Sequence, residues 1–199
     1  MSGKEKQKDL KGENSKKKTE VIFKPASEVI LKKPDTSKGE LVSLVAKVQS
    51  VTISKHLLRE MTEYSIKSKP REAIGLLGGK QQRTNELIIS KILFVSEGDE
   101  VSVSFSDNDF DAFEEILEND NHCLGWWHSH PGYGLFLSQT DINTHIYSFQ
   151  LHNDLSVALV VDPAMIDMKG LAQFKFFQVV GKEGKDPFRY KEVASYIKQ

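Results

Sequence analysis

Cysteine is almost absent from this sequence, and apolar runs of membrane-spanning length are missing. The single cysteine, Cys123, excludes an intramolecular disulfide and fits a reducing compartment, where it is expected to be a packed thiol. No apolar stretch reaches the roughly 20 residues that a membrane-spanning helix needs. The first ten residues, MSGKEKQKDL, also lack the pattern of a secretory signal. We therefore expect an intracellular, cytoplasmic protein that does not associate with a membrane.

Charge is distributed unevenly along the chain. Residues 1–40 contain 11 lysines and 7 acidic residues, a net charge of +4, whereas the whole chain carries −1. Because residues 1–20 have almost no apolar side chains, a lysine-rich and largely disordered N-terminal extension is expected over residues 1–40. The lysines are interleaved with acidic residues, so nucleic acid is not an expected partner.

The remaining chain alternates strand-like and helix-like segments, which is typical of a mixed α/β domain. A helix capped by Ser54 is expected, because apolar residues follow it at steps of three and four. Another helix is expected from 138 to about 152 and a third from near Asp107. The expected strands cover 45–53, 72–78, 86–95, 101–106, 126–130, 155–161 and 170–180. One folded domain is therefore expected over 41–186, followed by a short helix over 187–199.

The most informative segment is GWWHSHPGYGLFLSQTD, residues 125–141. Side chains alternate faces along a strand, so His128 and His130 point the same way and can reach one ion. The PGYG sequence forces a loop, after which Asp141 returns on the first turn of the next element. Two histidines and a carboxylate suit Zn²⁺ and leave a fourth position for water, as in catalytic sites. The structural alternative is two ordinary half-buried histidines and a capping box from Ser138 to Asp141.

A catalytic zinc site that cleaves a peptide-like bond also needs a carboxylate to carry the proton. The candidate is Glu72, in the segment KPREAIGLLGGK. Residues 73–79 are expected to form a buried strand, and a charged residue at the mouth of such a strand needs a reason. The alternative is that Glu72 caps the preceding helix or pairs with Arg71.

The E-x-x-G-L-L-G segment that begins at Glu72 and the GWWHSHPGYG-x-x-L-S-x-x-D segment resemble the JAMM (MPN+) metallopeptidases, which are zinc-dependent deubiquitinases and their relatives. The resemblance covers about residues 47–180 and is strongest to the proteasome-lid and signalosome type. It implies an MPN domain, an α/β fold with a mixed central β-sheet flanked by helices. It also implies one Zn²⁺ held by His128, His130 and Asp141. Glu72 would then be general base and acid, and Ser138 would hydrogen-bond the developing oxyanion.

The resemblance further implies an isopeptidase that separates ubiquitin or a ubiquitin-like modifier from lysine, with the proteasome or another MPN-domain protein as partner. The family's modifier-contacting insertion corresponds to the loop that precedes the expected substrate-binding residues Val101, Ser102, Val103 and Ser104, for which a plain acidic hairpin connection is the alternative. His145, where the lid type tends to have glutamine, is expected at the surface or behind the ligands rather than as a fourth ligand. Two other functions stay open: a compact archaeal-type JAMM peptidase acting on sulfur-carrier or small archaeal modifier proteins, and a non-catalytic MPN scaffold.

Overall fold

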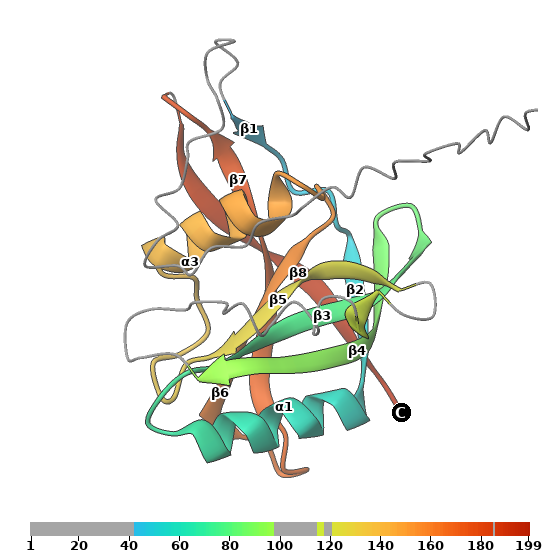
Figure 1. Ribbon diagram of the computed structural model, residues 1–199, viewed down its shortest axis with the longest axis vertical. Coiled ribbons are helices and arrows are strands. Elements are labelled where there is room, and N and C mark those ends of the chain that lie inside the picture. Colours follow the sequence, from blue (N-terminus) through green and yellow to red (C-terminus); the bar gives the residue numbers. More distant parts are fainter. Residues whose placement is uncertain (1–41, 98–114, 118–120, 185) are drawn as a thin grey trace, which may run out of the picture.

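The computed structural model describes residues 42–97, 115–117, 121–184 and 186–199 (Figure 1). The expected extension over 1–40, the strand at 101–106 and most of the helix from Asp107 lie outside these residues. The strands are β1 (Ser43–Leu44), β2 (Ser50–Ser54), β3 (Ala73–Arg83), β4 (Glu86–Glu97), β5 (His122–Ser129), β6 (Val157–Ile166), β7 (Ala172–Lys182) and β8 (Asp186–Lys198). The helices are α1 (Lys55–Ser68), α3 (Gln139–Thr144) and the π-helix η4 (His145–Gln150). Among the described helices, none is long and apolar enough to cross a membrane.

The strands form one mixed sheet that closes on itself. Their order is β1-β7-β6-β5-β3-β4-β2-β8, and β8 pairs again with β7. The first part of β8 is antiparallel to β7, with Phe176 opposite Val193, and its last residues run parallel to β2, with Ser50 opposite Ala194. β3 and β5 are neighbours in the middle of the sheet, and β5 also pairs with β6 in parallel. The expected α/β fold with a mixed central sheet is therefore confirmed.

Helices cover both faces of the sheet (Figure 1). Consecutive residues of a strand point to opposite faces, so the two neighbouring tryptophans of β5 pack against different helices. Trp127 packs in the core cluster that contains Leu57, Leu58 and Met61 of α1. Trp126 packs instead with Ile142 of α3 and with Ile146 and Phe149 of η4. The face that carries Trp126 also carries His128, whose ring stacks on the indole at 4.5 Å between centroids. The candidate site therefore lies on the side of the sheet that α3 and η4 cover.

Helix α1 begins where the sequence indicates. The Ser54 side chain accepts a hydrogen bond from Leu57 N at 3.2 Å, so the expected N-cap is confirmed. The helix ends at Ser68, shortly before Pro70, which has no N–H to continue the ladder. This end of α1 leads through three residues into Glu72 and β3.

The helix expected over 187–199 is wrong, because Asp186–Lys198 form the strand β8. Residues 187–199 mix charged and apolar side chains, as an amphipathic helix does, but they also include Phe188, Tyr190, Val193, Tyr196 and Ile197, which favour strands. Pairing with both β7 and β2 decides between the two. These residues belong to the main sheet and are not an appendage to it.

Two other elements differ from expectation at their ends. The first long strand begins at Ser50, five residues later than expected, and the two-residue β1 precedes it. The helix expected from 138 to 152 is α-helical only as far as Thr144 and continues as the π-helix η4. Single-turn π-helices are frequent near functional sites. Here the wider turn begins at His145.

Gly75 near the start of β3 permits a very close approach of three strands. A Cβ atom at this position would lie 1.8 Å from the Leu93 carbonyl oxygen in β4 and 2.3 Å from Nε1 of Trp127 in β5. Trp127 Nε1 donates to that same carbonyl at 3.2 Å. The glycine therefore makes room for an indole hydrogen bond three residues beyond Glu72.

Candidate metal centre

His128 and His130 come together at the C-terminal end of β5. His128 is opposite Ile74 of β3 and Val160 of β6, so it sits in the middle of the sheet. Both imidazoles are buried, and their Nε2 atoms are 3.0 Å apart. The expectation that strand geometry turns both rings to one side agrees with this convergence. The two rings offer two nitrogen donors to a common point.

Asp141 brings a carboxylate to the same point from the first turn of α3. Its Oδ1 lies 3.5 Å from His128 Nε2, and its Oδ2 lies 3.7 Å from His130 Nε2. One ligand atom from each of the three residues lies within 4.8 Å of the others, so this buried group could hold a metal ion. In the described part of the chain it is the one such group of histidines, cysteines and carboxylates.

Ser138 and Asp141 form the capping box that the sequence indicates. Ser138 N donates to Asp141 Oδ2 at 2.7 Å, and Asp141 N donates to Ser138 Oγ at 3.2 Å. The structural and functional explanations of this pair are therefore compatible, because the box fixes the carboxylate that faces the imidazoles. A serine hydroxyl carries one proton of its own, so Ser138 Oγ can still donate while it accepts from Asp141 N.

Glu72 lies just before β3 and faces the histidines from another part of the fold. Its Oε1 is 3.8 Å from His130 Nε2, and its side chain is 18% exposed. The position is fixed from the opposite face of β5, where the Ser129 hydroxyl accepts a hydrogen bond from Ala73 N at 2.8 Å. This hydrogen bond ties the start of β3 to the end of β5.

Burial and charge together set the ionisation of the centre. Burial raises the pKa of Glu72 above its ordinary value, and Asp141 adds to this, while His128 and His130 partly oppose it. Burial alone would also raise the pKa of Asp141, but the two histidines and Ser138 outweigh it and hold that pKa far below the usual range. Burial lowers the pKa of His130, yet Asp141, Glu72 and the Gly134 carbonyl together raise it overall. Asp141 is thus kept as an anion, whereas Glu72 binds a proton more readily than an exposed glutamate does.

His145 lies behind the centre and not at the surface. It is fully buried on η4, and its Nδ1 accepts a hydrogen bond from Trp126 Nε1 at 3.3 Å. Trp126 in turn stacks on His128. Burial lowers the pKa of His145 to about 3, although the Ser156 backbone and the Gln150 side chain partly oppose the shift. The residue is therefore a neutral acceptor that supports the ring beneath His128.

Replacing His145 with glutamine is expected to flatten the pH dependence of stability. The pKa of His145 falls from 6.5 to about 3 on folding, so between these values the unfolded chain binds the extra proton. The free energy of unfolding therefore falls as pH drops below 6.5, by about 1.4 kcal/mol per unit from this residue. Glutamine cannot titrate, but it keeps an acceptor for Trp126 Nε1. Urea unfolding at pH 7, 6 and 5 measures both slopes, and equal slopes for the two proteins would contradict the expectation.

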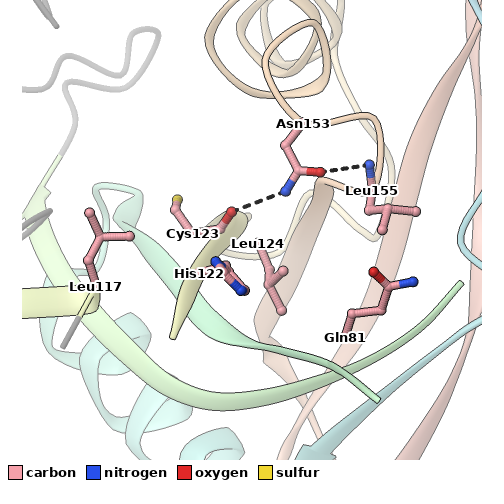
Figure 2. Close-up of a pocket in the computed structure, with 7 residues that line it drawn as sticks. All are labelled: Gln81, Leu117, His122, Cys123, Leu124, Asn153 and Leu155. Carbon is pink, nitrogen blue, oxygen red and sulfur yellow. Dashed lines mark hydrogen bonds between the residues drawn. The ribbon is translucent and has the colours of Figure 1, made fainter. Parts of the chain in front are cut away.

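The expected substrate-binding residues Val101, Ser102, Val103 and Ser104 lie outside the described residues. The pocket shown in Figure 2 is a separate feature, at the opposite end of β5 from the two histidines. Its volume is about 380 Å³, and its lining includes His122, Cys123 and Asn153. Burial raises the pKa of Cys123, which disfavours the reactive thiolate. Nothing in this pocket matches the chemistry of the candidate metal centre.

The chain is similar to known proteins over most of its described residues. Residues 46–153 match the family described as JAB1/Mov34/MPN/PAD-1 ubiquitin protease. The chain is 28% identical over 143 residues to COP9 signalosome complex subunit 5b of Arabidopsis thaliana, covering 69% of this chain and 40% of that protein. It is 32% identical over 137 residues to ubiquitin carboxyl-terminal hydrolase RPN11 of Saccharomyces cerevisiae, covering 66% of this chain and 44% of that protein.

The chain thus spans less than half the length of these curated relatives. Among solved structures, a protein from Desulfitobacterium hafniense determined in solution superposes with a TM-score of 0.54 at 22% identity. That match covers 75% of this chain and 93% of the other chain, and it shows a shared fold.

Proposed function

Because the chain belongs to the JAB1/Mov34/MPN/PAD-1 ubiquitin protease family, we propose that it is a zinc-dependent isopeptidase. The bond that it hydrolyses joins the C-terminal glycine of ubiquitin, or of a ubiquitin-like modifier, to a lysine side chain. The observation that carries the proposal is the convergence of His128, His130 and Asp141 on one point. Glu72 faces the same point, with its Oε1 3.8 Å from His130 Nε2.

The donor set fits Zn²⁺. His130 Nδ1 is within 3.0 Å of the Gly134 carbonyl oxygen, which can only accept, so Nδ1 carries the proton and Nε2 keeps its lone pair. Asp141, held as an anion, supplies the charge that a divalent cation needs. His128, His130 and Asp141 would hold the ion, and three protein ligands leave a position open. When bound, Zn²⁺ would supply Lewis acidity, which makes water a stronger acid and polarises a carbonyl group.

The reaction then needs one proton carrier, and Glu72 is proposed for this role. It accepts a proton from the water that attacks the glycine carbonyl carbon. It returns that proton to the lysine nitrogen as the carbon–nitrogen bond breaks, so the products are a carboxylic acid and an amine, and transfer of the acid proton leaves a carboxylate and an ammonium group. A raised pKa suits a carboxyl group that must hold the proton between the two steps. Ser138, whose hydroxyl proton is available, donates a hydrogen bond to the oxygen that becomes negatively charged.

The proposed substrate and partners are suggested by the relatives' names. One is called a ubiquitin carboxyl-terminal hydrolase, and others are subunits of the 26S proteasome and of the COP9 signalosome. We propose ubiquitin or a ubiquitin-like protein as the substrate and the proteasome or another MPN-domain protein as the partner. The cytoplasm, where the single cysteine stays reduced, is the proposed location.

The test of this function is to measure cleavage of lysine-linked diubiquitin by the full chain with its native metal, after a strong chelator, and after Zn²⁺ is restored. We expect about one equivalent of zinc per chain, at least a tenfold loss of rate with chelator, and full recovery. The variant Cys123→Ser is the matched control, and its activity should be unchanged because no thiol takes part. Less than half an equivalent of zinc together with no cleavage would instead favour a non-catalytic scaffold.

A further inference from the structure

Asp162 is a buried carboxylate beside the candidate metal centre that the mechanism above does not use. It lies on β6, which runs parallel to β5 with Ser129 opposite Val161, and it is 1% exposed. Its partners are backbone N–H groups: Oδ1 accepts from Gly132 N at 3.0 Å and from Ala164 N at 2.8 Å, and Oδ2 accepts from Gly134 N at 3.0 Å. Among the described residues, no basic side chain forms an ion pair with it. Burial of a carboxylate at this place therefore needs a reason.

The two glycines that Asp162 holds belong to the loop that follows His130. Both have positive φ angles, 89° for Gly132 and 92° for Gly134, a backbone conformation that other residues rarely adopt. The ladder to β6 continues as far as His130, whose N–H donates to Val161 O at 2.9 Å. Beyond this point the Asp162 carboxylate takes the place of a strand partner for the loop backbone. The loop is thus anchored at Gly132 and Gly134.

The anchored loop returns to the imidazole of His130. Gly134 donates its N–H to Asp162 and presents its carbonyl oxygen 3.0 Å from His130 Nδ1. The carboxylate and the imidazole are thus each hydrogen-bonded to the backbone of Gly134. The other ring nitrogen, His130 Nε2, is the atom that faces His128 and Asp141. Outer partners of this kind fix the tautomer and orientation of metal-binding histidines.

We propose that Asp162 is a positioning residue for the metal centre. It fixes the 131–134 loop, so that the Gly134 carbonyl holds the proton on His130 Nδ1 and leaves Nε2 for the ion. The proposal rests on the metal site of the proposed function and adds to it a residue that touches neither metal nor substrate. A carboxylate suits the task because it accepts at both oxygens, whereas an asparagine would turn an N–H₂ group toward one of the backbone donors.

Asp167 provides a matched control. It also anchors a turn through backbone N–H groups, because its Oδ1 accepts from Lys169 N at 2.8 Å and from Leu171 N at 2.9 Å. That turn joins β6 to β7 and is not part of the metal centre. The change Asp167→Asn therefore disturbs a similar loop without disturbing His130.

The experiment compares Zn²⁺ affinity, by competition with a chromophoric chelator, for the full-length wild type, Asp162→Asn and Asp167→Asn. We expect the first variant to bind 10- to 100-fold more weakly and the control to stay within about twofold of wild type. The visible spectrum of Co²⁺-substituted Asp162→Asn should differ from that of the wild type, whereas the spectrum of Asp167→Asn should match it. A folded Asp162→Asn variant that binds Zn²⁺ within about twofold of wild type would overturn the positioning role.

A second measurement needs no variant. Nitrogen-15 NMR of the metal-free wild type, at a pH where the spectrum shows a neutral imidazole, reports which nitrogen of His130 carries the proton. The proton is expected on Nδ1, and its presence on Nε2 would overturn the proposal. The two hypotheses fail separately, because an inactive protein that binds zinc through a correctly positioned His130 would reject the isopeptidase and retain the role of Asp162.

Discussion

Replacing Glu72 with glutamine is expected to lower the turnover of lysine-linked diubiquitin by 10²- to 10⁴-fold, the range typical of a lost general acid–base group. Glutamine has nearly the same shape as glutamate, but its side-chain amide cannot act as a base. Because Glu72 is not among the three residues that could hold the ion, zinc content should be unchanged. The kinetic effect should appear mainly in kcat, since the proton is transferred during the reaction and not on binding.

The control for this prediction is Glu60→Gln. Glu60 lies on α1, where it pairs with His56 at 3.7 Å, and its side chain is 42% exposed. Its replacement should leave both rate and zinc content unchanged. Glu72→Gln with full zinc and a rate equal to that of Glu60→Gln would show that another group carries the proton. A loss of zinc in Glu72→Gln would show instead that the carboxylate helps to hold the metal.

Replacing Gly75 with alanine is expected to reduce the free energy of unfolding by about 3 kcal/mol or more, because the added Cβ overlaps rigid atoms. It would lie 1.8 Å from the Leu93 carbonyl oxygen and 2.3 Å from Trp127 Nε1, so β3 and β4 must separate and the Trp127 indole must move. Either movement breaks the Trp127–Leu93 hydrogen bond inside the core. Urea unfolding followed by Trp fluorescence gives the stability directly.

Gly78 on the same strand is the comparison. A Cβ there would first meet side-chain atoms, Ile116 Cγ1 at 3.1 Å and Lys91 Cβ at 3.4 Å. Such atoms can shift by a few tenths of an ångström, so Gly78→Ala should cost less than about 1.5 kcal/mol. Equal losses of unfolding free energy at the two positions would mean that the loss of glycine itself, and not the close approach at Gly75, determines the effect.

The sequence predicts most of the candidate centre because its geometry is local. Alternation along a strand brings His128 and His130 to one face, and a capping box fixes Asp141 three residues after Ser138. Glu72 is harder to predict from the sequence, since only the pairing of β3 with β5 brings it near His130. The motif nevertheless indicated it, because a charge at the mouth of a buried strand is unusual. The family and the α/β fold predicted from these segments are confirmed.

The sequence does not predict the structural roles of Asp162 and Ser129, for a physical reason. Their partners are backbone N–H groups, and every residue except proline carries one, so no side-chain pattern marks the contact. The one available signal was an acidic residue at the end of the apolar run Ala158–Val161. β8 was missed because its conformation depends on strands far away in sequence, which periodicity within the segment does not report. The predicted substrate-binding residues 101–104 lie outside the described residues and stay a prediction.

The way in which β8 closes the sheet has a consequence for how the molecule assembles. β3 and β4 are joined by a short hairpin, and β5 and β6 lie close in sequence, so the strands around the two histidines can meet early. Pairing of Ser50 with Ala194 spans about 140 residues, and such long loops are slow to form. The same late step covers the free edges of β2 and β7, whose unpaired N–H and C=O groups would otherwise be open to other chains. Formation of β8 thus removes two sheet edges at which the domain could pair with another copy of itself.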